Sequence, residues 1–107
     1  NMILLTFRFA GEIQEIIIKG NELLFHHQGI VTSVEGLKLD KKGVMKEFPD
    51  LEGKDDWRLE AIRRLKEHIK KMNTEEERME YVKEELKKQG YEPLFFQKAG
   101  WRPQHFR

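Results

Sequence analysis

The sequence predicts a single α+β domain spanning residues 1–107, in which a pair of helices packs on one face of an antiparallel sheet. Turn residues recur about every 8–10 positions over residues 1–53, which is typical of an antiparallel meander of five or six short strands. Apolar residues then recur at helical spacing over residues 54–90, and residues 91–107 predict a short strand followed by a basic, aromatic tail. Because the strands precede the helices instead of alternating with them, a parallel sheet is not expected.

The length and composition favour a small intracellular protein. A chain of 107 residues can bury roughly 65% of its unfolded surface and fold without metals or disulfides. It has no cysteine, which excludes thiol chemistry and a zinc–thiolate site. Charged residues make up 36%, and the abundance of Lys and Glu resembles the composition of hyperthermophile proteins. No apolar stretch approaches the roughly 18 residues that a bilayer span needs, so we expect a cytoplasmic protein that does not enter a membrane.

The first strand is predicted over residues 2–9, where alternating apolar residues would bury one face. Turns are predicted at Ala10-Gly11 and Gly20-Asn21, where residues that tolerate positive φ occur together. The remaining strands of the meander are predicted at residues 12–19, 22–27, 30–34, 37–39 and 44–48, with residues 40–43 as the loop between the last two.

Two of these strands carry apolar side chains on both faces. Ile17 points away from Ile16 and Ile18, and Leu4 points away from Leu5. Because the helices can cover only one face, the second must be covered by the C-terminal tail, by curling of the sheet into a barrel-like shape, or by another copy of the chain. We favour the last of these, a homodimer.

The helices have chemical start and stop signals. Asp55 or Asp56 can cap the first helix by accepting hydrogen bonds from its free amides. Thr74 and Glu77 have the spacing of a capping box at the start of the second helix, and Gly90 is suited to end it. The final strand follows at residues 94–96, and Pro93 places it at an edge of the sheet or near its own start.

The C-terminal stretch interleaves aromatic and basic residues. Aromatic rings stack on unpaired bases while Lys and Arg neutralise phosphates, so this stretch suggests binding of single-stranded nucleic acid. The alternative, which residue statistics favour, is that its aromatic rings pack on the sheet. The net charge of +1 also argues against a strong general attraction to nucleic acid. The candidate residues are Lys98, Trp101, Arg102, His105 and Arg107, together with a basic stripe of Arg63, Lys66 and Lys70 on the first helix.

His26 and His27 are the candidate metal ligands, because imidazole titrates near neutral pH and binds most transition metals. Adjacent residues on a strand point to opposite faces, so both rings can bind one ion only if the backbone is distorted. The sequence contains no metalloprotease, phosphate-loop or calcium-loop motif, and a structural role for both histidines is favoured.

These observations predict a small binding protein that uses no cofactor and is not an enzyme. The first hypothesis is a nucleic-acid-binding accessory factor. The second is a self-associating structural or regulatory subunit, which binds a partner protein or a second copy of itself through the apolar sheet face. The third is a small metal-dependent hydrolase that uses His26 or His27.

The nucleic-acid hypothesis predicts an affinity that depends on salt. Binding of single-stranded RNA or DNA should weaken as salt is raised, and Arg102→Ala should weaken it further because one phosphate contact is lost. Fluorescence anisotropy with a labelled oligonucleotide measures both effects. No detectable binding at low salt would contradict the hypothesis.

Overall fold

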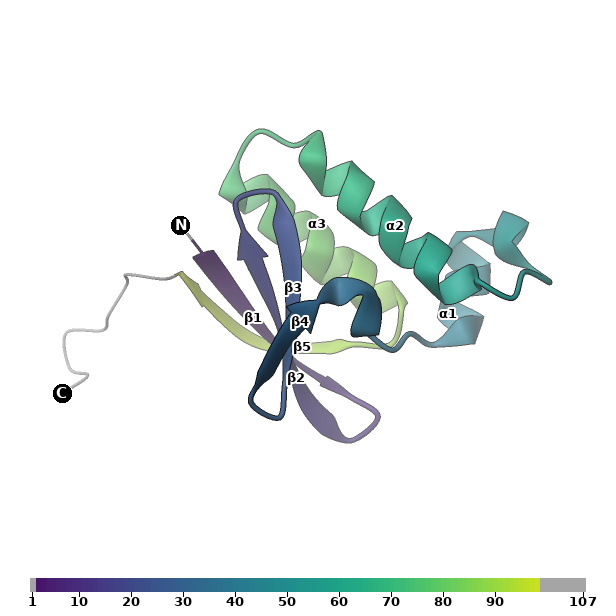
Figure 1. Ribbon diagram of the computed structural model, residues 1–107, viewed down its shortest axis with the longest axis horizontal. Coiled ribbons are helices and arrows are strands. Elements are labelled where there is room, and N and C mark those ends of the chain that lie inside the picture. Colours follow the sequence, from purple (N-terminus) through teal and green to yellow (C-terminus); the bar gives the residue numbers. More distant parts are fainter. Residues whose placement is uncertain (1, 99–107) are drawn as a thin grey trace, which may run out of the picture.

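A computed structural model describes residues 2–98 and contains a five-stranded antiparallel sheet with all of its helices on one side (Figure 1). The α+β prediction is confirmed. Four strands follow one another as a meander, and the fifth returns after the helices to pair with the first, so the order is β4-β3-β2-β1-β5. The strands are β1 (Met2–Phe9), β2 (Glu12–Lys19), β3 (Glu22–His27), β4 (Ile30–Ser33) and β5 (Glu92–Lys98).

Tight turns with positive φ join the first four strands. The β1–β2 turn has φ of 52° at Ala10 and 79° at Gly11, and the β3–β4 turn has φ of 54° at Gln28 and 82° at Gly29. Two successive positive φ values are characteristic of type I′ turns, whose twist matches that of the flanking strands. These turns determine which residues face each other across the sheet.

The predicted strands at residues 37–39 and 44–48 are wrong. That region forms a short helix, α1 (Lys41–Glu47), between two 3-10 turns, η1 (Val34–Gly36) and η2 (Pro49–Leu51). The amide of Val44 donates to the Asp40 carbonyl at 3.0 Å, and the amide of Phe48 donates to the Val44 carbonyl at 2.7 Å. Apolar residues at positions 44, 45 and 48 also fit helical spacing, so this short pattern does not distinguish a strand from a helix.

The two long helices are α2 (Trp57–Lys70) and α3 (Glu75–Lys88). The predicted capping box is confirmed, because the amide of Glu77 donates to Thr74 Oγ1 and the amide of Thr74 donates to Glu77 Oε1, each at 3.1 Å. Gly90, with φ of 100°, follows the end of α3 as predicted. Asp56 precedes α2, but its side chain accepts no hydrogen bond from the helix amides, so the predicted side-chain cap is wrong.

The core lies between the sheet and the helices, with α2 and α3 crossing one face (Figure 1). Alternate residues of the strands point into it, and the apolar stripes of both helices meet them. β5 is an edge strand with Pro93 as its second residue, as predicted. The most deeply buried side chains of this layer are Ile3, Leu5, Phe7, Ile16, Ile18, Val34, Leu37, Ile62, Ile69, Val82 and Leu86.

Gly43 allows α1 to approach the end of α3. A Cβ atom at this position would overlap the carbonyl oxygen of Lys88 and lie 3.3 Å from the Cα of Gln89. Gly→Ala inside a helix normally stabilises it by up to about 1 kcal/mol. Here we expect Gly43→Ala to lower the free energy of unfolding by about 1–3 kcal/mol, because the helices must separate.

Urea denaturation measures this effect, and Gly36→Ala is the matched control. A Cβ atom at Gly36 would make only ordinary contacts, 3.7 Å from the side chains of Phe25 and Thr32. If Gly43→Ala were as stable as the parent protein, the close approach would not constrain the packing of α1.

Candidate functional site

The sheet face opposite the helices carries a cluster of apolar side chains, and no other element within residues 2–98 covers it; we call it the open face (Figure 1). The strand register places Leu4, Ile17 and Leu24 side by side in a row across β1, β2 and β3. All three are half-buried by their neighbours. Exposed apolar side chains surround this row: Met2, Ile13, Val31 and Phe95, which are 41%, 52%, 54% and 61% accessible.

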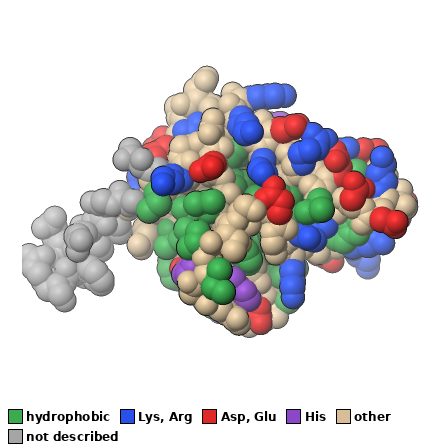
Figure 2. Space-filling model, in the orientation of Figure 1, with side chains coloured by type: hydrophobic (Ala, Val, Ile, Leu, Met, Phe, Trp, Pro, Cys, Tyr) green, Lys and Arg blue, Asp and Glu red, His purple; other side chains and the backbone are tan. Residues whose placement is uncertain are grey.

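Hydrophobic side chains gather over the sheet beside histidine in Figure 2, whereas Lys, Arg, Asp and Glu side chains dominate the helical end of the molecule. A shallow hollow of about 350 Å³ lies on the open face, with Leu4 and Ile17 in its lining. An apolar surface that is concave and lies on a rigid sheet is typical of a binding site.

A polar pair crosses the open face next to the apolar row. His26 of β3 lies directly opposite Glu15 of β2, and its Nδ1 atom is 2.5 Å from Glu15 Oε1. The two side chains are 33% and 27% exposed and both line the hollow. Thr6 of β1 lies opposite Glu15 on the other side of β2. Its buried Oγ1 atom has no hydrogen-bond partner among the described residues.

His27 lies on the other face of the sheet, as the strand geometry predicts. Its ring stacks on Phe25 with the ring centroids 5.7 Å apart, and its Nε2 atom is 3.2 Å from Glu12 Oε1. The two candidate metal ligands are therefore separated by the sheet. Within residues 2–98, no three side chains of the types that bind metals lie close enough together to hold an ion.

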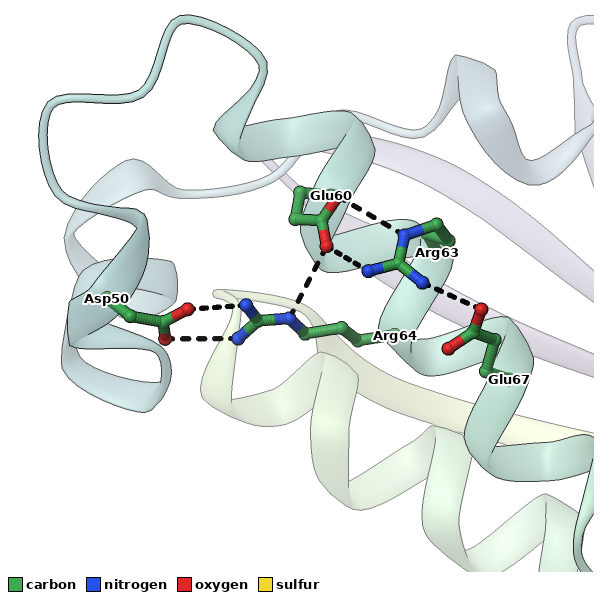
Figure 3. Close-up of polar contacts among 5 residues, drawn as sticks. All are labelled: Asp50, Glu60, Arg63, Arg64 and Glu67. Atoms are coloured by element: carbon green, nitrogen blue, oxygen red, sulfur yellow. Dashed lines mark hydrogen bonds and ion pairs between the residues drawn. The ribbon is translucent and has the colours of Figure 1, made fainter.

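The basic stripe of α2 is largely paired with carboxylates. Arg63 lies between Glu60 and Glu67, with Arg63 Nη1 at 2.7 Å from Glu67 Oε2, and Arg64 links Glu60 to Asp50 of η2 (Figure 3). The hydrogen bond from Arg63 holds the pKa of Glu60 below its usual value, and the one from Arg64 does the same for Asp50. Arg63 therefore presents less net positive charge to a phosphate than its sequence position indicates.

Two other predicted nucleic-acid residues also have acidic neighbours. The Nζ atom of Lys66 is 2.5 Å from Glu35 Oε2, and that of Lys98 is 2.7 Å from Glu76 Oε2. Lys70 is exposed and has no carboxylate within 4.0 Å in the part of the chain that the structure describes. The other predicted residues, Trp101, Arg102, His105 and Arg107, lie outside the described residues.

Glu15 was not predicted as a site residue, although the strand register that the sequence predicts identifies it. The predicted turn at Gly20-Asn21 makes Lys19 and Glu22 the first cross-strand pair, and counting outward from that pair places Glu15 opposite His26. The ion pairs of Lys66 and Lys98 offered no such signal, because their carboxylates lie 31 and 22 residues away in the sequence.

None of the helices within residues 2–98 combines the length and the apolar character that a bilayer crossing requires. Comparison with protein-family models, curated proteins and solved structures finds no match to this chain. The interpretation of the candidate site therefore depends on the positions of its own residues.

The Lys66–Glu35 pair predicts a measurable acid sensitivity. The hydrogen bond from Lys66 lowers the pKa of Glu35 to about 2 from 4.5. A depressed carboxyl pKa adds stability above the unfolded value, and this stability is lost as the pH falls between about 4.5 and 2. We expect Lys66→Gln to raise the pKa of Glu35 towards its ordinary value and to reduce this acid-dependent loss.

NMR titration of the Glu35 carboxyl carbon measures the pKa directly, and Lys70→Gln is the matched control on the same helix. If the Glu35 pKa stayed near 2 in the Lys66→Gln variant, the Lys66 ammonium would not be held by Glu35.

Proposed function

We propose that this protein is a non-catalytic binding protein that self-associates into a homodimer through its open face. The observation that carries the proposal is the apolar row of Leu4, Ile17 and Leu24, which no other element of residues 2–98 covers and which exposed apolar side chains surround. Contiguous apolar surface of this kind mostly marks an interaction site, since leaving it in water is unfavourable.

The charges of the open face fit a second copy of the same surface. Apart from Glu15, which is paired with His26, the charged side chains of the open face lie towards the ends of the strands. There cationic and anionic groups occur together, as in the Arg8–Glu92 ion pair at 3.4 Å and the cross-strand pair of Lys19 and Glu22. An apolar centre with a polar rim is the usual anatomy of a protein interface. A surface of mixed charge is complementary to its own copy in a two-fold arrangement, whereas a strongly charged partner such as nucleic acid requires a surface of one sign.

The size of the open face suits a modest interface. Five strands about 4.8 Å apart, with roughly six residues each contributing about 3.3 Å, give a projected area of roughly 500 Å². The accessible surface is larger than this projection, and a standard interface buries about 800 Å² per partner. Two such sheets packed about 10 Å apart would form a sandwich, for which we expect a Kd in the micromolar range.

The other two hypotheses stay predictions from the sequence. The pairing of Arg63, Lys66 and Lys98 with carboxylates does not favour the nucleic-acid role. The separation of His26 and His27 by the sheet does not favour a hydrolase that uses both rings on one metal.

The proposal predicts that a charge on the open face weakens the dimer. Val31→Lys places an ammonium group at a position that is 54% exposed, so we expect the fold to tolerate it while the Kd rises at least about tenfold. Sedimentation equilibrium at about pH 6 measures the Kd of the parent protein and the variant.

Leu59→Lys is the matched control, because Leu59 is 45% exposed on α2 and lies on the helical side of the molecule. Its Kd should equal that of the parent protein. A parent protein that stays monomeric up to about 1 mM, or an equal loss of association in both variants, would contradict the proposal.

A further inference from the structure

The Glu15–His26 pair lies near the centre of the open face. β2 is the middle strand of the five, and Glu15 is the fourth of its eight residues. In a symmetric two-fold dimer, the same patch is used on both subunits, and side chains near the axis face their own copies. Dimerisation through the open face therefore brings two Glu15–His26 pairs close together and removes both from water.

No other charged side chain lies directly beside this pair within residues 2–98. The neighbours across the strands and along them are uncharged: Thr6, Ile13, Ile17, Leu24 and Val31. The charged residues of the open face lie further along their strands, with Arg8 on β1, Lys19 on β2, Glu22 on β3 and Glu92 on β5. Arg8 is itself 3.4 Å from Glu92.

The charge of the pair depends on protonation of His26. With a neutral imidazole, the pair carries one negative charge from Glu15, and two such charges facing each other in a dehydrated interface repel each other and lose their hydration. With a protonated imidazole, the carboxylate is neutralised by the ring whose Nδ1 lies 2.5 Å away. If Glu15 is also protonated at low pH while His26 keeps its proton, the pair becomes positive and the repulsion returns.

We propose that pH regulates the self-association through this pair, with the dimer favoured near about pH 6 and weakened above neutral pH. This inference rests on the proposed homodimer. Linkage gives the direction in which the Kd changes with pH. Above neutral pH each protomer takes up as much as one proton on association, so raising the pH weakens the dimer. We expect the Kd to rise at least about tenfold between about pH 6 and about pH 8.5.

Sedimentation equilibrium of the full chain at these two pH values and constant ionic strength tests the proposal. His26→Gln keeps a hydrogen-bonding side chain but cannot be protonated, so its Kd should be the same at both pH values. Glu15→Gln leaves the imidazole without its carboxylate, so protonation would then place an unpaired positive charge in the interface. The pH dependence should therefore invert, with the weaker dimer at the lower pH.

His27→Gln is the matched control, because this ring lies on the helix-facing side of the sheet beside Glu12. It should keep the full pH dependence of the parent protein. Far-ultraviolet circular dichroism of each variant at both pH values shows whether it is folded.

The outcomes separate this inference from the proposed function. A parent dimer with the same Kd at both pH values would overturn the pH regulation and leave the homodimer standing. A pH dependence that survives in His26→Gln would overturn the assignment to this pair. A parent protein that is monomeric at both pH values up to about 1 mM would overturn the homodimer and the regulation together.

Discussion

The period-two geometry of β2 is the constraint on which the rest of the structure depends. Ile16 and Ile18 are fully buried under the helices, and the intervening Ile17 must point to the opposite face. Both long helices pack on the same side, so they cannot cover Ile17 or its neighbours. The open face is therefore a direct consequence of a strand that is apolar on both sides, in a domain with one helical layer.

Polar contacts hold the irregular segment between the sheet and the helices, which makes the open face part of a firmly connected scaffold. Arg58 Nη1 donates to the carbonyls of Glu35 and Leu37 at 2.6 and 2.7 Å. The hydroxyl of Tyr91 donates to the Lys38 carbonyl at 2.6 Å, and burial raises the pKa of Tyr91. These donors satisfy carbonyls that neither the sheet nor a long helix pairs. Arg58 of α2 and Tyr91, the residue before β5, are therefore tied to the same short stretch of chain.

Interactions between residues close in the sequence could be predicted, whereas most contacts between distant segments could not. Thr74 and Glu77 are close in sequence and satisfy each other's amides whatever surrounds them, so the capping box could be identified in advance. The helix containing Val44 was missed because a five-residue apolar pattern fits both periodicities, and tertiary packing decides between them. The pairing of Glu15 with His26 lies between these cases, since a tight turn fixes the register of the strands that it joins.

The ion pairs of the helical layer and the Glu15–His26 pair lie on opposite sides of the sheet. Hydrogen bonds from Arg64, Arg63 and Lys98 lower the pKa values of Asp50, Glu60 and Glu76, so these carboxylates stay ionised to a lower pH than usual. Their contribution to stability is present above their unfolded pKa values and is lost only as the pH falls through the depressed ones. The Glu15–His26 pair lies on the open face and shares no residue with these ion pairs. The proposed pH regulation of self-association would therefore act on the open face and leave the ion pairs of the helical layer in place.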